Sequence, residues 1–371
     1  MSEIRVERRL SAILAADVVG YSRLMGVRAA SIAIFDQQRA KLVATLLGRI
    51  KMKAILVRDF GGPEVLKLEE VPTPKPTAGQ VLVRIRAAGV NPYDTYMRAG
   101  TYARKPPLPY TPGSDGAGIV EAVGEGVKKV KQGDRVYTTK TVSGAYAEYA
   151  LALEQQVHPL PAKISFSQGA GVWVPYGTAY HALYHSAKAH ASETVLVHGA
   201  SGGVGSAAVQ IARSMGLTIL GTAGTPAGLE MAKREGANQV FDHRKAGYQE
   251  EILKATGNRG VDIILEMLAN VNLAHDTKLL AKDGRVIVIG NRGEVTINAR
   301  ELMARRASIR AFTLWDITPV EEADIHAGLI AGLENGTLRP IVGKELPLAE
   351  AARAHKEILE PGAAGKIVLT C

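Results

Sequence analysis

The feature that most constrains the fold is a glycine-rich turn between a predicted strand and a predicted helix. A short β-branched run at 194–198 leads into the turn Gly199-Ala200-Ser201-Gly202-Gly203-Val204-Gly205. Apolar residues then recur at helical spacing from Val204 to Met215, which predicts a helix. A strand that enters a helix through glycines gathers free main-chain N–H groups at the positive end of the helix dipole.

Strands and helices continue to alternate after this turn. Predicted strands at 218–223, 240–242, 261–266 and 285–289 alternate with predicted helices at 229–235, 252–255 and 273–280. Apolar strands separated by helices favour a parallel sheet covered on both faces. In that context the turn resembles the G-x-G-x-x-G pyrophosphate loop, with Ala200 at the first glycine, followed by Gly202 and Gly205. We therefore predict a dinucleotide-binding Rossmann domain.

The second predicted strand lacks the acidic residue that NAD sites place at its end. The segment from Leu220 to Thr225 contains no carboxylate, and the next acid is Glu230. A carboxylate at the strand end would repel a 2′-phosphate, and basic residues follow the third strand at 243–245. The sequence therefore favours NADPH as the cofactor.

The flanking regions have a different pattern. From Met52 to Tyr149, predicted strands at 53–58, 80–86 and 118–122 are separated by Gly and Pro, with little helix. The last stretch combines a predicted helix at 320–335 with a strand at 365–369, and it is too short to fold alone. We expect it to return to the β-rich unit. The expected domains are an N-terminal extension (1–51), a β-rich catalytic domain (52–176), a Rossmann domain (177–314) and the returning segment (315–371).

The chain contains one cysteine, Cys371. Thiolate zinc sites need several cysteines at defined spacing, and the nine histidines show no H-E-x-x-H pattern, so we expect no bound metal. A lone cysteine also fits a reducing compartment. No apolar run approaches the roughly 20 residues of a membrane-spanning helix. We therefore expect a cytoplasmic protein that does not enter membranes.

The positive charge is concentrated at the N-terminus. Residues 1–51 hold nine Lys and Arg and four acids, which gives +5 of the total formal charge of +9 and leaves +4 for the remainder. A modest excess spread over 320 residues suits an anionic cofactor as well as it suits nucleic acid. RNA binding is therefore possible but unsupported by the sequence.

Several separated blocks resemble one family. They are Phe60–Leu66, Gly89–Pro92, Thr95-Tyr96, Leu108–Asp115, His198–Gly205, His243-Arg244 and Glu266–Leu273. From Met52 to Leu369 the chain resembles the zeta-crystallin-like NADPH:quinone oxidoreductases, the zinc-free branch of the medium-chain dehydrogenases/reductases. The resemblance implies an α/β fold in which a Rossmann doubly wound parallel sheet is inserted in a β-rich GroES-like catalytic domain. It also implies a homodimer or homotetramer, to which the apolar run 309–315 can contribute.

The resemblance also implies roles for individual residues. Expected cofactor contacts are Tyr96, Ser201, Gly202, Gly203, Val204, Gly224, His243, Asn272, Ile289, Gly290, Asn291, Arg292, Phe312, Thr313 and Leu314. Expected catalytic residues near a quinone are Tyr96, Asn91, Asp94 and Tyr102. The implied reaction is NADPH-dependent reduction of quinones without zinc.

Other interpretations remain open for these residues and for the chain. Tyr96 can donate a hydrogen bond to a quinone oxygen or serve as a packed aromatic, Asn91 can be a turn residue before Pro92, and Asp94 can cap a helix. The same fold can reduce activated alkenes such as enones or enoyl thioesters, or act as an RNA-binding or structural protein. No Ser–His–Asp or Cys–His arrangement is evident, so we expect no covalent enzyme intermediate.

The N-terminal extension carries a separate resemblance. Residues 5–25 resemble the opening of class III nucleotide cyclases, in which the residue at Asp17 binds a catalytic metal. The resemblance stops near Gly26, and a single strand cannot assemble such a site. We therefore expect a non-functional extension.

Overall fold

The computed structural model describes residues 51–362 and 364–371. The cyclase-like stretch at 5–25 lies outside the described residues. The chain divides into two compact units. Met1–Met52 with Glu70–Thr73 form the first, and Lys53–Glu69 with Pro74–Cys371 form the second. All of the predicted cofactor and catalytic residues belong to the second unit.

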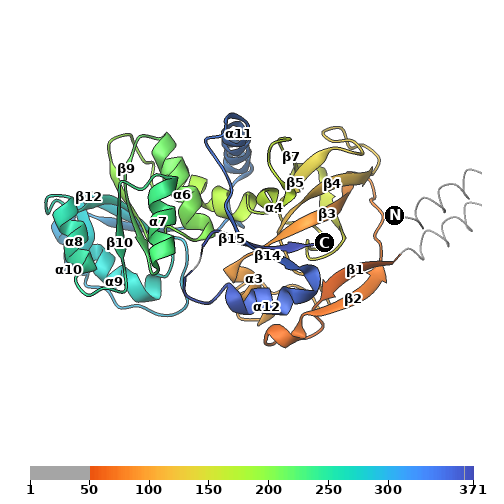
Figure 1. The fold of residues 1–371 in the computed structure, drawn as a ribbon, viewed down its shortest axis with the longest axis horizontal. Coiled ribbons are helices and arrows are strands. Elements are labelled where there is room, and N and C mark those ends of the chain that lie inside the picture. Colours follow the sequence, from red (N-terminus) through yellow and green to blue (C-terminus); the bar gives the residue numbers. More distant parts are fainter. Residues whose placement is uncertain (1–50, 363) are drawn as a thin grey trace, which may run out of the picture. The chain divides into compact units, whose positions relative to one another are not determined.

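A six-stranded parallel sheet forms the nucleotide-binding part of the second unit (Figure 1). Its strands are β8 (Thr194–Val197), β9 (Thr218–Ala223), β10 (Gln239–Asp242), β11 (Val261–Glu266), β12 (Leu280–Val288) and β13 (Ser308–Ala311). The order is β10-β9-β8-β11-β12-β13, with every neighbouring pair parallel. This is the doubly wound Rossmann order, in which the chain reverses direction across the sheet between β8 and β11.

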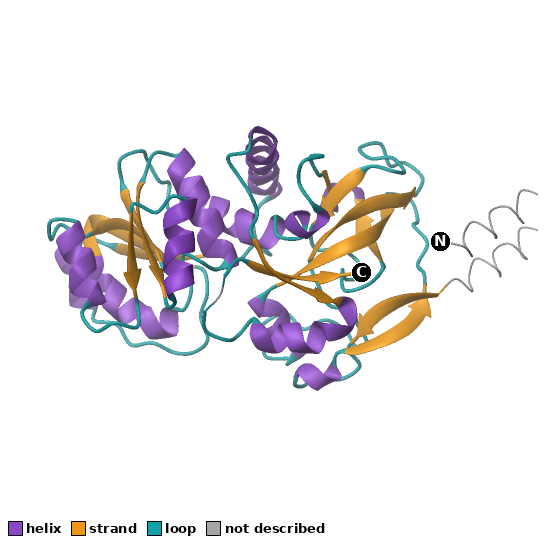
Figure 2. Ribbon diagram, in the orientation of Figure 1, coloured by secondary structure: helices purple, strands orange, loops and turns teal. Residues whose placement is uncertain are grey.

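Helices cover both faces of this sheet (Figure 2). They are α6 (Gly203–Ser214), α7 (Pro226–Glu235), α8 (Tyr248–Ala255), α9 (Ala269–Leu279) and α10 (Ala299–Arg305). Alternate residues of β8 point to opposite sides, as a pleated strand requires. Val195 and Val197 pack in the same buried cluster as Ile211 of α6, whereas Leu196 packs with Ile252 of α8 and Leu273 of α9. The continuous apolar runs in the sequence reflect this burial on both faces.

A second sheet of the same unit has seven strands. Its strands are β3 (Gln80–Val90), β4 (Asp115–Val123), β5 (Arg135–Thr138), β6 (Tyr149–Leu153), β7 (Val157–Pro159), β14 (Val342–Pro347) and β15 (Lys366–Thr370). The order is β14-β15-β3-β4-β5-β7, and β6 also pairs with β3. β15 runs antiparallel to β3, so the end of the chain lies beside a strand nearly 280 residues earlier. β1 (Lys51–Leu56) and β2 (Lys67–Pro72) form a separate two-stranded sheet.

The other helices described here lie before β8 or after β13 along the chain. They are α3 (Pro92–Arg98), α4 (Phe166–Gly169), α5 (Thr178–Tyr180), α11 (Pro319–Asn335) and α12 (Ala351–Glu357). Short 3₁₀ turns lie at η1 (Pro63–Val65), η2 (Glu154–Gln156) and η5 (Leu348–Glu350), and π-helical turns at η3 (Trp173–Gly177) and η4 (His181–Ser186). Within the described residues, no helix is both long enough and apolar enough to cross a membrane.

The sequence missed α3, where it favoured a turn before Pro92. Pro92 occupies the first helical position, where its missing N–H costs nothing. The Asp94 carboxylate accepts a hydrogen bond from the Asn91 main-chain N–H at 2.8 Å and so fixes the start of the helix. The predicted capping role of Asp94 is therefore present, and α3 carries three of the four predicted catalytic side chains on or beside it.

Candidate active site

The predicted pyrophosphate loop leaves the carboxyl end of β8 and enters α6 through Gly202. Gly199 has a φ of +59°, a conformation that glycine adopts without strain. A Cβ at Gly205 would collide with the Gly199 carbonyl oxygen and with Ala200, so glycine permits the close packing of turn and helix. No side chain caps α6 at Gly202. The first N–H groups of the helix can therefore bind phosphate oxygens.

The loop is tied to the last strand of the seven-stranded sheet. The Gly365 N–H donates a hydrogen bond to the Ser201 carbonyl oxygen at 2.7 Å, and Gly202 forms an isolated β-bridge with Gly365. Lys366, the next residue, begins β15. The backbone that orients the predicted phosphate-binding groups is thus fixed by Gly365, 164 residues after Ser201 along the chain.

Gly224 and His243 meet beyond the end of β9. A Cβ at Gly224 would lie 2.6 Å from His243 Nε2, so the glycine leaves room for the imidazole. Partial burial lowers the pKa of His243. The Asp242 carboxylate accepts a hydrogen bond from the Arg244 N–H at 3.0 Å, and it also lies 3.5 Å from Arg244 Nε. The structure brings together two residues that the resemblance implied as cofactor contacts.

A buried charge network lies between the phosphate loop and β11. His198 Nε2 lies 2.8 Å from Asp276 Oδ1 and 3.6 Å from Glu266 Oε2. Glu266 Oε1 accepts hydrogen bonds from the Leu268 N–H and, at 3.2 Å, from the predicted cofactor contact Asn272. Burial raises the pKa of Glu266 to about 7. The network holds Asn272 against the end of β11, at the switch point of the sheet.

The same three side chains offer one ligand atom each within 4.8 Å of one another. This is the single group of that kind among the residues the structure describes. Burial opposes the shift, but the Asp276 and Glu266 carboxylates raise the pKa of His198. The three side chains therefore form a buried network in which the imidazole lies between two carboxylates.

The segment after β12 connects the Rossmann domain to α3. The Ile289 N–H donates to the Glu266 carbonyl oxygen at 2.8 Å, and a Cβ at Gly290 would collide with Met267. Arg292 Nε donates a hydrogen bond to the Tyr96 hydroxyl at 2.9 Å. Two residues that the sequence assigned separately to the cofactor are thus in direct contact across the two parts of the fold.

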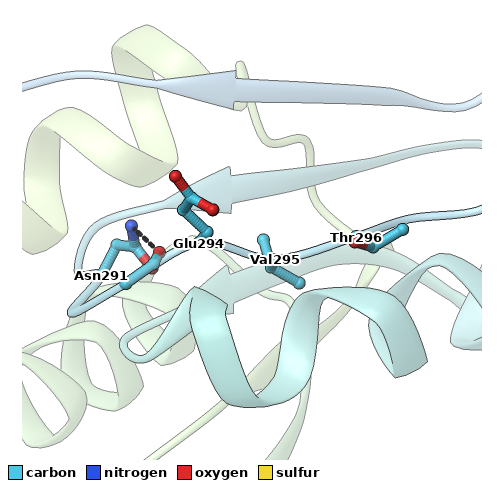
Figure 3. A pocket seen from close by; sticks show the side chains of 5 residues that line it. Asn291, Glu294, Val295 and Thr296 are labelled. Atoms are coloured by element: carbon cyan, nitrogen blue, oxygen red, sulfur yellow. Dashed lines mark hydrogen bonds between the residues drawn. The ribbon is translucent and has the colours of Figure 1, made fainter.

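Asn291 lies beside a cavity of about 560 Å³ in the same segment. Its amide donates to the Gly293 carbonyl oxygen at 2.7 Å, and Glu294, Val295 and Thr296 also line the cavity (Figure 3). The lining is formed by five residues of one irregular and mostly exposed segment, 291–296. None of the predicted catalytic residues faces this cavity.

The third predicted cofactor segment, 312–314, packs against helical residues. The Phe312 ring stacks on His181 with centroids 4.1 Å apart. The Thr313 hydroxyl donates to Asp316 at 3.0 Å, and Leu314 lies 3.7 Å from the position a Cβ would take at Gly177. The next residue, Trp315, meets Tyr93 edge-on at 6.0 Å. The segment therefore ends in contact with α3.

A second cavity, of about 470 Å³, lies next to α3. Its lining combines polar groups from Asp94, Ser114 and Lys140 with the aromatic rings of Tyr110 and Trp315 and several prolines. Val142, at the rim, is 54% exposed, so the cavity is accessible to solvent. A largely apolar cavity with a few fixed polar groups is typical of a small-molecule site.

Of the predicted catalytic residues, Asp94 alone lines this cavity. Asn91 is buried, and its amide is committed to Asp115 Oδ2 at 3.0 Å and to the ammonium of Lys366. Tyr96 contacts Arg292, as described above. Tyr102 does not line the cavity, but it forms a side-chain hydrogen bond with Trp315, which does.

The sequence missed the charged pair that organises this region. Lys366 Nζ lies 3.0 Å from Asp115 Oδ2, and Asp115 Oδ1 accepts a hydrogen bond from the Val174 N–H at 3.0 Å. Both charged side chains are 5% exposed or less. Asp115 stood in a block of the family resemblance, but no local pattern links it to a lysine 251 residues away.

Comparison with known proteins agrees with this architecture. Residues 203–327 match the family described as Zinc-binding dehydrogenase, and residues 77–162 match the Alcohol dehydrogenase GroES-like domain. Quinone oxidoreductase of Homo sapiens is 53% identical over 324 residues, which cover 87% of this chain and 98% of the human protein. The quinone oxidoreductase of Lama guanicoe is 54% identical with the same coverage.

Solved structures show the same fold. An NAD-dependent alcohol dehydrogenase superposes with a TM-score of 0.81 at 30% identity, covering 86% of this chain and all of the other. The Escherichia coli quinone oxidoreductase complexed with NADPH superposes with a TM-score of 0.77 at 30% identity, covering 85% of this chain and 99% of the other. The predicted fold class, a Rossmann domain inserted in a GroES-like domain, is confirmed. The chain belongs to the quinone oxidoreductase family of the medium-chain dehydrogenases/reductases.

Proposed function

We propose that the protein reduces quinones with NADPH and without a metal ion. One observation supports this above the others: α3 borders both halves of the required site. The Tyr96 hydroxyl, on α3, accepts a hydrogen bond from Arg292 in a predicted cofactor segment. Asp94, on the same helix, lines the cavity of about 470 Å³. A cofactor on the Rossmann side and a flat ring in the cavity would therefore meet at one short helix.

Bound NADPH would supply the reducing equivalents at this meeting point. The residues of the chain align the two partners and exclude water, which is the main requirement for a readily reduced substrate. The glycine-rich loop and the N-terminus of α6 would hold the pyrophosphate. The cavity walls of Tyr110, Trp315 and prolines would hold a planar ring against the nicotinamide.

The preference for NADPH over NADH rests on the end of β9. The strand ends at Ala223 and Gly224 without a carboxylate, and His243 and Arg244 lie close by. A 2′-phosphate would meet cationic and polar groups there. The negative charge of Asp242 is paired with Arg244. The similarity to an E. coli enzyme complexed with NADPH supports the same choice.

Stopped-flow absorbance of NADPH with simple ortho- and para-quinones tests the proposal. We expect quinone-dependent loss of NADPH absorbance, a lower KM for NADPH than for NADH, and no loss of activity after exhaustive treatment with a metal chelator. Failure to oxidise NADPH above the rate without enzyme, with any quinone tried, would contradict the proposal.

Reduction of activated alkenes is the second candidate function. The polar groups Ser114 and Lys140 in the cavity favour it, because they can hold the carbonyl oxygen of an enone. Comparison of kcat/KM for a quinone and for an enone of similar size distinguishes the two. A larger value for the enone would reverse the assignment.

We further propose that the protein forms a homo-oligomer in the cytoplasm. β13 is the edge strand of the six-stranded sheet, and Arg310 and Ala311 on it are exposed. An open edge strand can pair with a second copy of itself. Light scattering coupled to size exclusion measures the assembly, and Arg310→Pro is expected to shift it toward monomer.

A further inference from the structure

His198 lies where two predicted cofactor-binding segments of the Rossmann sheet separate. β8 and β11 are neighbouring parallel strands, and their pairing ends at Val197 and Leu265. The His198 N–H donates to the Leu265 carbonyl oxygen at 3.2 Å. Beyond this bond the chain enters the glycine-rich turn after β8 and the segment that leads to Asn272 after β11. Pairing of the two strands no longer sets the distance between these segments, which leaves that task to side chains.

One nitrogen of the His198 side chain reaches the base of the glycine-rich turn. Nδ1 lies 3.4 Å from the hydroxyl oxygen of Thr222, a fully buried residue of β9. The same oxygen accepts a hydrogen bond from the Gly199 N–H at 3.2 Å, and the Thr222 carbonyl oxygen accepts one from the Ala200 N–H at 2.8 Å. Thr222 therefore fixes the first two residues of the turn, and His198 contacts the hydroxyl group that takes part in this.

The other nitrogen of the imidazole contacts two carboxylates, one of which holds Asn272. Nε2 lies 2.8 Å from Asp276 Oδ1 on α9 and 3.6 Å from Glu266 Oε2 at the end of β11. The second oxygen of Glu266 accepts hydrogen bonds from the Leu268 N–H and, at 3.2 Å, from the Asn272 side-chain amide. A continuous set of contacts therefore runs from the glycine-rich turn through the imidazole to Asn272.

The charge of His198 suits it to join both sides. Burial opposes protonation, but the Asp276 and Glu266 carboxylates raise the pKa of the imidazole. An imidazolium donates from both ring nitrogens, whereas a neutral imidazole donates from one only. Protonated His198 can therefore donate to Asp276 and to Thr222 at the same time, so both nitrogens of a residue that is 3% exposed have a partner.

We propose that His198 is a positioning residue for NADPH, an assignment that rests on the proposed function. Its imidazole keeps the turn that receives the pyrophosphate in register with Asn272, so the two parts of the cofactor site share one geometry. His198 acts through Thr222 and Glu266 rather than on the cofactor itself. If the link is cut, cofactor binding must itself bring the turn and Asn272 into register, and this ordering lowers the affinity.

Thr222→Val cuts the link at the turn without removing a buried charge, because valine has a similar shape but no hydroxyl group. We expect the dissociation constant for NADPH, measured by fluorescence titration, to rise about tenfold, the order of one lost buried hydrogen bond. Thr222→Ser keeps the oxygen and should bind NADPH nearly as the wild type does. His275→Gln, at an exposed position of α9 next to Asp276, is the matched control and should leave binding unchanged.

A double-mutant cycle tests whether the two ends of the link act together. Asn272→Ala removes the predicted cofactor contact at the far end. The combined Thr222→Val and Asn272→Ala variant should raise the dissociation constant by less than the product of the two single effects, with a shortfall of at least about threefold. In His198→Gln the glutamine amide can replace Nε2 at Asp276 but not Nδ1 at Thr222. The shortfall should therefore disappear when the cycle is repeated in that background.

A cofactor fragment separates positioning from a general loss of structure. Adenosine 2′-phosphate carries the 2′-phosphate but lacks the pyrophosphate. Its dissociation constant should therefore stay within about twofold of wild type in every variant, as for an independent site. The kcat at saturating NADPH and quinone should also be nearly unchanged, because loss of binding that is equal in the ground state and the transition state raises KM alone.

The outcomes separate this inference from the proposed function. If the wild type binds no NADPH, both fail, and if it binds NADPH but reduces no quinone, the proposed function fails while the binding cycle still decides the inference. If the two single effects multiply in full, or NADPH and adenosine 2′-phosphate lose affinity equally, the inference fails and His198 is structural. Should His198→Gln not fold, the cycle of Thr222→Val and Asn272→Ala decides alone.

Discussion

Lys366 Nζ lies 3.0 Å from Asp115 Oδ2 in a region where neither side chain is more than 5% exposed. The lysine begins β15 and the aspartate begins β4, the two strands that flank β3 on either side. Asn91 bonds to both of them. This buried ion pair therefore joins the two strands on either side of β3, and Gly365, the residue before Lys366, holds the phosphate loop.

Loss of the lysine charge should destabilise the fold. Lys366→Met leaves the Asp115 carboxylate buried without its cation, and removal of one partner of a buried ion pair costs about 3–5 kcal/mol. Urea unfolding measures the change. Lys366→Met combined with Asp115→Asn should recover most of it, because no uncompensated charge remains. Lys344→Met, at an exposed pair with Glu357, should cost under about 1 kcal/mol. Equal losses for the two lysines would refute the prediction.

Substitution in the glycine-rich turn should abolish cofactor binding. Gly205→Ala places a Cβ against the Gly199 carbonyl oxygen and Ala200, so the loop must shift from its phosphate-binding shape. We expect the dissociation constant for NADPH to rise by at least about tenfold, which corresponds to about 1.4 kcal/mol. In Gly62→Ala the new methyl group meets only the movable carboxylate of Glu64, and binding should be unchanged. Fluorescence titration with NADPH compares them.

A carboxylate at the end of β9 should reverse the cofactor preference. Gly224→Asp brings negative charge to the position where a 2′-phosphate is expected, as NAD sites do. KM for NADPH should rise at least about tenfold more than KM for NADH. Gly224→Ser makes the same contact with His243 without the charge, so it separates repulsion from crowding. Equal increases in KM for NADPH and for NADH in Gly224→Asp would mean that the 2′-phosphate binds elsewhere.

The buried network at Glu266 should make stability depend on pH. In the unfolded chain a glutamate titrates near pH 4.3, whereas burial raises the pKa of Glu266 to about 7 in the fold. The native state therefore holds an extra proton between these values, and the stability it contributes is lost as pH rises through about 7. Glu266→Gln can still accept from Leu268 and donate to Asp276.

We expect Glu266→Gln to raise the Tm above that of the wild type, and to raise it more at pH 8 than at pH 5. The difference between the two pH values should correspond to about 1–3 kcal/mol of unfolding free energy. Thermal unfolding by circular dichroism at the two pH values measures it. The raised pKa of His198 has the same sign, so part of the pH dependence should remain in the variant. The exposed Glu345→Gln is the control, and a pH-independent difference would show that Glu266 is ionised throughout.

Local sequence patterns were enough to predict the Rossmann half of the fold. Its strands are buried on both faces and the helices α6, α7 and α8 are amphipathic, so the local pattern and the tertiary structure agree over most of the segment from β8 to β12. The phosphate-binding turn at Gly199–Gly205 was also predicted from the sequence, because close main-chain approach requires glycine at fixed positions. Helix α3 was not predicted, because Asn91 and Pro92 are as typical of a turn as of the start of a helix.

Which polar residues share a site depends on how distant parts of the chain pack together. Lys366, Asp115 and Asn91 meet because β15 and β4 pair with the same strand, and Tyr96 reaches Arg292 because the two parts of the chain fold against each other. Burial, which raises the pKa of Asp94, arises from packing by residues scattered over the chain. Local sequence encodes periodicity and turn geometry, whereas long-range contact and loss of solvent exist only after the chain has folded.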